Sequence, residues 1–272
     1  MSVGPGEAPT DVPQPEDIYR RTKEEGGRRL ERPALEVLST AVAAGFDIAG
    51  GLTALALVGS QIEPWVGRSA QHVFASIGFG SSFAFLVAGR GELFTENFLV
   101  PIAGLDHRSR GSWLGLLRLW TISPIANILG GALVVVILTV HGVLPHGTAR
   151  TIVSAADTVH ANGYVALFFS AVFAGALMTA MTWFVEGQRS MLVRIVIAWT
   201  VGTMIALGYF DHVIVETLEL AYGMRFGAPV PVSFLVANVG IAFAGNIAGG
   251  IGLVTLNRLT QGRQGERKRS SA

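Results

Sequence analysis

The sequence predicts an all-α membrane protein whose six transmembrane helices form an inverted 3+3 repeat with broken second and fifth helices. Three observations support this fold class. Of the 272 residues, 50% are hydrophobic and 14% are charged, with a mean hydropathy of +0.50, whereas about 25% of the residues in soluble domains are charged. Six apolar segments are long enough to cross the ~30 Å hydrocarbon core of a bilayer. Two polar motifs inside these segments also occur twice, at one fixed spacing.

Polar tails flank a long apolar region. Residues 1–34 are rich in Pro, Gly and charge and lack the apolar core of a signal peptide, which predicts a disordered or loosely helical tail. Residues 259–272 form a second, basic tail, better suited to contact anionic lipid than nucleic acid. Residues 35–258 then form the transmembrane domain. Its expected spans are 35–60, 69–89 continuing at 97–105, 113–144, 163–186, 191–210 continuing at 213–222, and 232–257.

The basic residues predict the orientation of the chain. Most of the 20 Lys and Arg residues fall in the two tails and in the connections after the second and fourth spans. Arg68, Arg150 and Arg225 fall on the other side, and Arg90 lies at membrane depth. Because loops rich in Lys and Arg stay in the cytoplasm, we expect a multi-pass protein of the cell (inner) membrane with both termini cytoplasmic.

Polar residues interrupt two of the expected spans. The stretch RGELFTENFLVP, which begins at Arg90, interrupts the second span, and GYFDHVIVETLEL, which begins at Gly208, interrupts the fifth. Glu92 and Asp211 hold corresponding places in the two stretches and are 119 residues apart. Non-helical backbone at membrane depth is tolerated only where protein or a water-filled cavity satisfies it. Both stretches are therefore expected to form loops that face a pore.

Two asparagines repeat the same spacing. Asn127 lies in ANILGGAL and Asn246 in GNIAGGIGL, again 119 residues apart. A shared spacing at independent landmarks predicts an internal duplication, and three spans per copy force the copies into opposite orientations. Matching broken helices in inverted repeats indicate a transport site. Because buried amides need hydrogen-bond partners, we expect both asparagines to brace the freed backbone of the broken helices.

The order of these motifs resembles the formate/nitrite transporter family. The resemblance rests on six spans, GELFTEN in the broken second helix, GYFDH in the broken fifth, and Asn-Ile-x-Gly-Gly in the third and sixth. It covers approximately residues 33–258. It implies an aquaporin-like protomer, a homopentamer with one pore per protomer, and passage of small monovalent anions such as formate or nitrite, or of their protonated forms.

His212, in the broken fifth helix, is the first candidate for the pore. The charge of a histidine changes near physiological pH, and a charged imidazole inside a membrane span is costly. His212 could give a proton to a weak-acid anion, which would then cross an apolar constriction uncharged. The alternative is a buried histidine bonded to a backbone carbonyl. Thr95, in the second helix, is expected to bond His212 or the solute, or else to cap the following half-helix.

Four apolar residues complete the expected pore. By the resemblance, Phe79, Phe83 and Ile205 form hydrophobic constrictions on either side of His212, and Leu93 supplies the apolar part of the loop. Phe79 and Phe83 are four residues apart and share a helix face. Plain helix packing explains that spacing equally well.

The charged residues of the two interruptions are expected to support the broken helices. Glu92 and Asp211 would cap or orient their loops, and Asp211 could accept bonds from backbone amides of the following half-helix. Arg90 is the basic residue at membrane depth, so we expect it to pair with Glu92 or Glu96.

The sequence departs from the family pattern at four positions near the expected pore. Glu96 stands where the family commonly has glycine, and Glu216 stands where an asparagine usually follows the histidine. Val159 aligns with an outer lysine, and Gly175 aligns with an asparagine of the fourth helix. Unpaired acids on the conduction path would repel anions. These changes predict a divergent branch of the family.

The favoured function is a channel or transporter for small monovalent weak-acid anions, with proton exchange at a central histidine. The alternatives are a channel for water or small neutral solutes on the same fold, and a non-conducting sensor. Enzyme activity is not expected, since GFGSS does not complete a Gly-x-Ser-x-Gly motif. No cofactor, metal site or nucleic-acid partner is expected. The expected partners are the solute, the lipid bilayer and further copies of the chain in a homopentamer.

Overall fold

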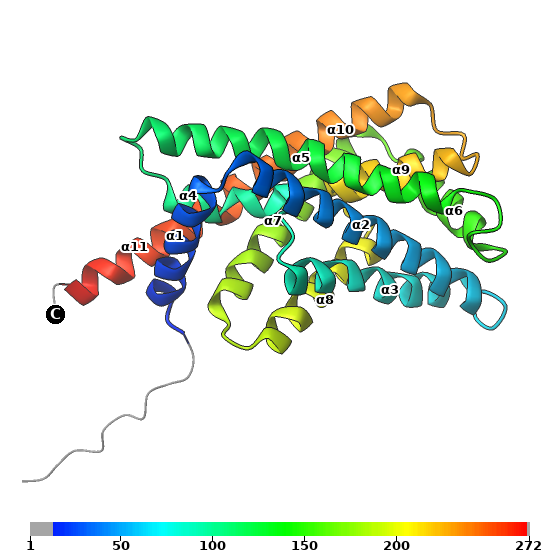
Figure 1. Cartoon of the computed structure of the whole chain (residues 1–272). Helices are drawn as coiled ribbons and strands as arrows, with labels where there is room; N and C mark the ends of the chain where they lie inside the picture. The colour runs from blue at the N-terminus through cyan, green and yellow to red at the C-terminus, as the bar shows by residue number, and fades with distance from the viewer. Residues whose placement is uncertain (1–12, 271–272) are drawn as a thin grey trace, which may run out of the picture.

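The computed structural model describes residues 13–270 (Figure 1). Within that range the chain contains helices and no strand, as the predicted all-α class requires. The elements are α1 (Pro15–Glu31), α2 (Ala34–Ile62), α3 (Arg68–Gly89), the 3-10 helix η1 (Phe94–Phe98), α4 (Val100–Gly104), α5 (Arg110–Leu138), α6 (Thr148–His160), α7 (Tyr164–Gly187), α8 (Met191–Leu207), α9 (Val213–Arg225), α10 (Val232–Ile247), the π-helix η2 (Ala248–Thr255) and α11 (Leu256–Ser270).

The long helices lie side by side, with α1, α4 and α11 at one end and α6 at the other (Figure 1). We call these the α1 end and the α6 end. Within the described residues, α2, α3, α5, α7 and the continuous α10–η2–α11 run are long and apolar enough to cross a membrane, and α8 is a shorter apolar helix. Two helices are broken as predicted. α3 stops at Gly89 and continues as η1 and α4, whereas α8 stops at Leu207 and continues as α9.

The two halves of the chain run in opposite directions. α2 follows α1 directly and so begins at the α1 end, whereas α7 finishes there, where Arg21 donates to the carbonyl oxygen of Gly187 at 3.4 Å. α5 also begins at that end, because Arg118 donates to the carbonyl oxygen of Leu30 at 2.8 Å. α10 runs the other way, toward α11, which packs on α1. This is the inverted arrangement that the sequence predicts.

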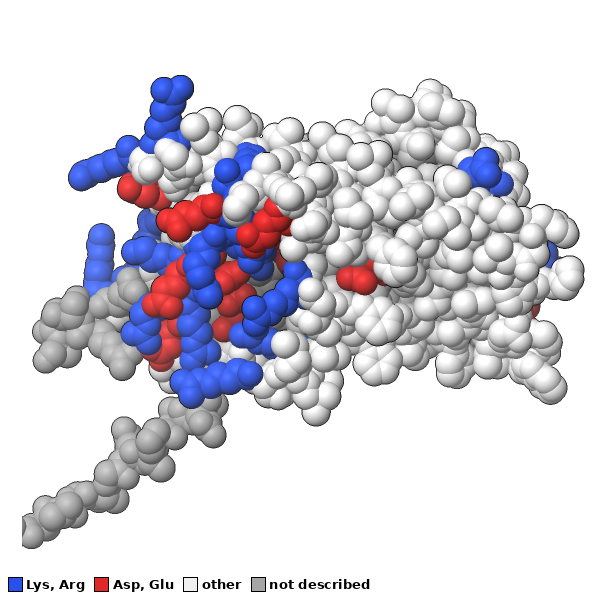
Figure 2. Space-filling model, viewed as in Figure 1, with Lys and Arg blue, Asp and Glu red and all other residues white. Residues whose placement is uncertain are grey.

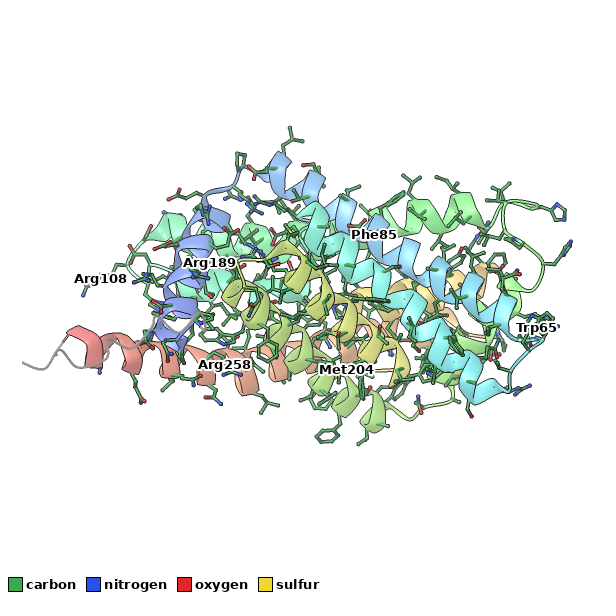
Figure 3. All side chains as sticks on the ribbon, turned by 90° about the horizontal axis from the view of Figure 1, so that it is seen from below. Trp65, Phe85, Arg108, Arg189, Met204 and Arg258 are labelled. Atoms are coloured by element: carbon green, nitrogen blue, oxygen red, sulfur yellow. The ribbon has the colours of Figure 1, made fainter. Side chains whose placement is uncertain are left out.

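Charge and apolar surface are separated along the molecule. Charged side chains gather at the α1 end, and the rest of the face in Figure 2 is largely uncharged. Figure 3 places Arg108, Arg189 and Arg258 toward that end and Trp65 at the other. Between them large apolar side chains point outward, including Phe85 (59% exposed) and Leu129 (61% exposed). An apolar belt of this extent suits hydrocarbon rather than water.

The N-terminal segment is more regular than the disordered or loosely helical tail that its composition suggested. Residues 15–31 form α1, whereas residues 1–12 lie outside the described residues. α1 buries Tyr19, Thr22, Gly26 and Leu30, which are spaced three or four residues apart and so share one face. That face packs on α4 and α11. Tertiary contact, rather than composition, therefore determines the structure of this segment.

The connection after the third span also differs from the prediction. α5 ends at Leu138, although the apolar run suggested a span to residue 144, and residues 148–160 form α6 rather than a loop. α6 buries Ile152, Ala155, Ala156 and Val159 on one side. α6 is only thirteen residues long, which is too short for a helix that spans a membrane.

Equivalent glycines allow close helix packing within each half of the chain. Gly130 of α5 lies against the carbonyl oxygen of Val42 in α2, and Gly249, 119 residues later, lies against the carbonyl oxygen of Val172 in α7. Neither position leaves room for a Cβ atom. Small residues allow the close approach of backbones on which helix association in lipid depends. The repeat therefore extends to the packing of the helices.

Gly249→Ala is expected to lower the free energy of unfolding by about 1–3 kcal/mol, because the added methyl group overlaps backbone atoms of α7. Gly252→Ala is the matched control, since Gly252 lies in the same π-helix with open space around it. Thermal unfolding of the detergent-solubilised variants measures the difference. Equal Tm values for the two variants would contradict this account of the packing.

Candidate functional site between the two broken helices

Each broken helix stops at a residue with left-handed backbone geometry. Arg90 follows α3 with φ 55°, and Tyr209, 119 residues later, lies after α8 with φ 48°. In both, the next amide N–H donates to the carbonyl five residues back, at 2.9 Å and 3.0 Å. Left-handed residues with bonds of this kind end a helix. The break is therefore built the same way in both halves.

Asn127 of α5 holds the loop that follows the first break. Its Nδ2 donates to the carbonyl oxygens of Ala41 at 2.8 Å and Glu92 at 2.9 Å. Its Oδ1 accepts from the amide of Phe94 at 3.0 Å. The side chain is fully buried, so these bonds satisfy backbone groups that water cannot reach. The contacts are those of a brace between α2, α5 and the loop.

Asn246 of α10 repeats this arrangement in the second half. Its Nδ2 donates to the carbonyl oxygens of Ala171 and Asp211, both at 2.9 Å. Its Oδ1 accepts from the amide of Val213 at 2.9 Å. The loop partners lie 119 residues after those of Asn127. The inverted repeat is thus visible at the level of single hydrogen bonds.

The two loops meet at Thr95 and His212. Thr95 Oγ1 lies 2.7 Å from His212 Nε2, and both side chains are fully buried. His212 is also the N-cap of α9, where its Nδ1 accepts from the amide of Val215 at 3.3 Å. Since Nδ1 accepts, the hydrogen of the neutral ring lies on Nε2 and is donated to Thr95. Thr95 accepts this bond, which leaves its own hydroxyl hydrogen for another acceptor.

A cavity of about 460 Å³ opens toward the α6 end. We call it the α6-side vestibule. α2, α3, α6, α8 and α9 contribute to its wall, which includes Phe79, Ile205, Tyr209, Glu216 and Glu219. The predicted constriction residues Phe79 and Ile205 therefore lie at this cavity, where they are buried.

A second cavity of about 610 Å³ opens toward the α1 end. We call it the α1-side vestibule. Its wall includes Arg29 of α1, Arg32 just after that helix, Leu86 of α3, Glu92 of the first loop and Glu96 of η1. The two vestibules approach the middle of the molecule from opposite ends, and different parts of α3 line each of them.

A closed barrier separates the vestibules. Phe79 lines one and Leu86 lines the other, a separation of seven residues, which in a helix is about 10 Å. Phe83 lies between them and packs edge-on against His212, with ring centroids 6.3 Å apart. Phe83 and Leu93 are fully buried and line neither cavity. The Thr95–His212 contact therefore lies inside the barrier.

Leu86 is a barrier residue that the sequence reasoning missed. It precedes Ile205 by 119 residues, and the two face opposite vestibules. Both are almost completely buried. Applying the repeat spacing to Ile205 would have identified Leu86.

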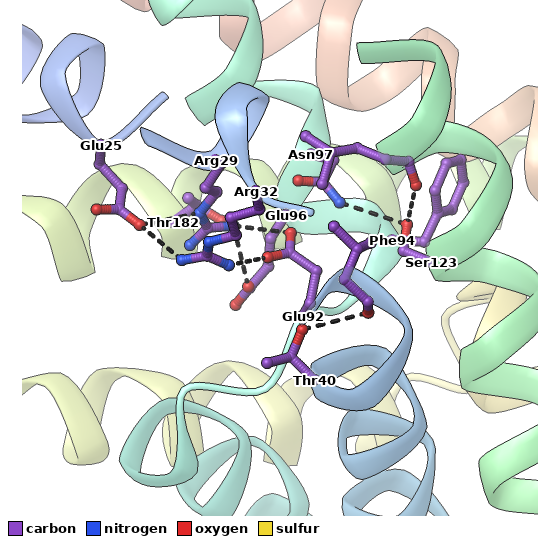
Figure 4. A network of polar contacts seen from close by, with 12 residues as sticks. Glu25, Arg29, Arg32, Thr40, Glu92, Phe94, Glu96, Asn97, Ser123 and Thr182 are labelled. Atoms are coloured by element: carbon purple, nitrogen blue, oxygen red, sulfur yellow. Dashed lines mark hydrogen bonds and ion pairs between the residues drawn. The ribbon is translucent and has the colours of Figure 1, made fainter. Parts of the chain in front are cut away.

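An ion-pair network closes around the first loop at the α1 end (Figure 4). Glu92, only 1% exposed, accepts from Arg29 at 3.2 Å and from Arg32 at 2.7 Å. Arg29 also lies 3.7 Å from Glu96 and 3.3 Å from Glu25. Burial lowers the pKa of Arg29, but these three carboxylates and that of Glu186 outweigh it, so its pKa is raised overall. Glu96 therefore lies beside a cation and is not an unpaired acid on the conduction path.

The predicted pairing of Arg90 with Glu92 or Glu96 is wrong. Arg90 is exposed and forms no ion pair with a described residue. The left-handed turn sends its side chain outward, whereas the amide of Glu92 donates to Thr40 of α2 at 3.1 Å and turns Glu92 inward. The charge of Glu92 is balanced by residues 60 and 63 positions earlier in the chain.

Asp211 differs from the role expected for it. Its Oδ2 accepts from the side chain of Asn238 in α10 at 2.8 Å rather than from backbone amides of α9. Its backbone amide donates to Ser170 of α7 at 3.1 Å. Asp211 therefore ties the second loop to α7 and α10, while Glu92 ties the first loop to α1. No group of three or more metal-ligating side chains is found among the described residues.

The comparisons with known proteins agree with this geometry. The family model described as "Formate/nitrite transporter" matches residues 16–259. The chain belongs to this family. Membership of the formate/nitrite transporter family confirms the predicted resemblance, the membrane fold and the expectation of a transport protein rather than an enzyme.

Relatives of this formate/nitrite transporter family member include "Inner membrane protein YfdC" of Escherichia coli (strain K12). It is 27% identical over 236 residues, which are 86% of this chain and 74% of the relative. Two solved structures share the fold. An "FNT family ion channel" has a TM-score of 0.72 at 15% identity, covering 89% of this chain and 97% of that one. A "Pentameric formate channel with formate bound" has a TM-score of 0.68 at 18% identity, covering 82% of this chain and 95% of that one.

Proposed function

We propose that the protein conducts a small monovalent weak acid, formate-like in size, with proton exchange at His212. The observation that carries the proposal is the contact between Thr95 and His212, which joins the two broken helices inside the barrier. The similarity to a structure described as a formate channel supports the class of solute.

The barrier favours a solute without net charge. Phe83, Leu86, Leu93 and Ile205 supply apolar walls, and moving a bare ion into such a region costs several kcal/mol even after relaxation. Addition of one proton converts the anion to its neutral acid and removes most of that cost. A proton exchanger inside the barrier is thus placed where the energy of the anion would be highest.

The hydrogen bonds of His212 define how the exchange would work. The neutral ring donates from Nε2 and polarises the Thr95 hydroxyl, whose hydrogen is available to the solute. The ring can release a proton to the solute only after Nδ1 has taken one up, and that uptake breaks the bond from the Val215 amide. Proton exchange at His212 is therefore coupled to the N-cap of α9.

The proposal also covers the orientation of the chain in the membrane and its assembly into an oligomer. The α1 end would face the cytoplasm, with both termini, because most basic residues gather there. Location in the inner membrane is supported by the name of the Escherichia coli relative. A homopentamer is supported by the similarity to a pentameric formate channel. Neighbouring protomers would then cover part of the outward apolar belt.

Flux through purified protein in liposomes tests the proposal. Lumenal pH is followed while formate, nitrite, acetate or chloride is added outside, in acidic and in neutral buffer. Wild type should admit the weak acids and not chloride, faster in acidic buffer. His212→Ala should slow weak-acid uptake by about tenfold or more, which corresponds to ~1.4 kcal/mol of barrier height. Thr95→Val, which removes the partner of Nε2, should act in the same direction.

His141→Ala is the matched control, because His141 is exposed in the loop after α5. It should leave the flux unchanged. Passage of water or urea that is indifferent to His212, without weak-acid uptake, would instead establish a channel for neutral solutes. Absence of all these fluxes would exclude conduction and leave the sensor alternative.

A further inference from the structure

Two carboxylates of α9 project into the α6-side vestibule. Glu216 and Glu219 are three residues apart, hence on one helix face, and both line the cavity. They are only 3% and 7% exposed. One oxygen of each, Oε1, has no hydrogen-bond partner among the described residues. Buried polar atoms are normally paired, so these two side chains stand out from the ordinary wall of the cavity.

No cation of the described residues forms an ion pair with either carboxylate. Of the cavity-lining residues in the described part of the chain, the basic ones are Arg68, Arg150 and His72. Arg68 is exposed, and Arg150 is 80% exposed and pairs with Glu63 at 3.6 Å. The ring of His72 stacks on that of Tyr209, with ring centroids 4.4 Å apart. The nearby Asp211 adds a third carboxylate behind the wall, bonded to the amide of Asn238 rather than to a cation.

The α1-side vestibule shows the opposite arrangement. There the buried carboxylate of Glu92 is held by two arginines, and Glu96 lies beside one of them. The protein therefore neutralises buried acids in one vestibule and leaves them without counter-charge in the other. Glu216 lies in the first turn of α9, where the positive end of the helix dipole favours its negative charge, whereas burial and the neighbouring carboxylates of Glu219 and Asp211 oppose it.

We infer that Glu216 and Glu219 set the charge selectivity of the pore, by excluding the bare anion from the α6-side vestibule. This inference rests on the proposed function and narrows its substrate class to the undissociated weak acid. Like charges repel strongly where water is scarce, and the vestibule ends at the closed barrier beside Phe79 and Ile205. A solute that arrives from the α6 end reaches that point already protonated, whereas one that arrives from the α1 end gains its proton at His212. Each solute molecule then carries no net charge across the membrane.

Simultaneous measurement of uptake and current tests the inference. Proteoliposomes report weak-acid uptake through a lumenal pH dye, and planar bilayers report anion current with potassium formate and potassium nitrite. Wild type should show uptake with little current. Glu216→Gln/Glu219→Gln keeps the shape of the wall and removes its charge. Its anion current should rise about tenfold or more over wild type, a change equivalent to ~1.4 kcal/mol, with a reversal potential that follows the anion gradient.

Glu63→Gln is the control, since it removes an acid from the same vestibule at an exposed, paired position. It should leave the current at the wild-type level. The single variants Glu216→Gln and Glu219→Gln replace the double variant if its elution volume or Tm shows misfolding.

The possible outcomes separate the inference from the proposed function. An equal anion current in wild type and the double variant, with uptake retained, overturns the inference and leaves the function intact. Ammonium current in wild type that disappears in the variant identifies a cation pathway and overturns it as well. If neither wild type nor any variant shows weak-acid uptake or anion current, both the proposed function and the inference are overturned.

Discussion

Asn246→Ala is expected to lower the free energy of unfolding by about 3–5 kcal/mol, because it leaves several buried backbone groups without partners at ~1–3 kcal/mol each. The lost bonds join Asn246 to the amide of Val213 and to the carbonyl oxygens of Asp211 and Ala171. Interhelical side-chain bonds in membranes average only ~0.6 kcal/mol. The amide of Val213, in the first turn of α9, and the carbonyl oxygen of Asp211, in the loop before it, have no partner within a helix and no alternative partner in lipid.

Chemical unfolding in mixed micelles, with Tm in detergent as a second readout, measures this loss. Asn162→Ala is the matched control, because Asn162 is exposed and its side chain donates only to Thr158, at 3.3 Å. Asn127→Ala should behave like Asn246→Ala, since its bonds are equivalent. An Asn246→Ala protein as stable as the Asn162→Ala control would show that the loops do not depend on the brace.

Glu92→Gln is expected to release α1 from the membrane domain. Each carboxylate oxygen of Glu92 is paired with one arginine, and a glutamine offers one acceptor and places an NH2 group against the other guanidinium. Removing one partner of a buried ion pair costs about 3–5 kcal/mol. Because Arg29 and Arg32 are partly exposed, we expect the loss of stability for Glu92→Gln to be ~3 kcal/mol. Trypsin should then cleave within α1, after Arg20, Arg21 or Lys23, about tenfold faster or more.

Glu36→Gln provides the comparison for that experiment. Glu36 also pairs with Arg32, at 3.3 Å, but is 50% exposed, and such surface pairs contribute ~0–1 kcal/mol. Its cleavage rate should stay near that of wild type. If Glu92→Gln and Glu36→Gln are cleaved at the same rate, the buried network does not hold α1 in place.

The sequence predicts the parts of the site that are local or repeated. Polar residues in an apolar span located both breaks, and the spacing of 119 residues between Asn127 and Asn246 identified the two braces as equivalents. The resemblance brought Thr95 and His212 together as candidates, and the structure places them 2.7 Å apart. Each of these inferences needed only a short motif or a comparison of two motifs.

The parts that failed depend on contacts that no local pattern encodes. The partners of Glu92 come from α1 and the residue after it, and composition alone predicted a disordered or loosely helical tail there. Arg90 is adjacent to these acids in sequence, but its left-handed backbone sends the side chain away from them. Leu86 has an ordinary helical position, and only its relation to Ile205 through the repeat distinguishes it.

The braces also determine which parts of the pore can move. Asn127 and Asn246 fasten both central loops to the first helix of each half, through Ala41 and Ala171. A swing of either loop would break several buried bonds at once, so the backbone at the centre forms a rigid frame. The barrier would then open through rotations of side chains such as Phe83. Side-chain rotations are faster than the hinge movements of domains. Under the proposed function, a molecule would pass through brief openings of this kind, without a coordinated rearrangement of the helices.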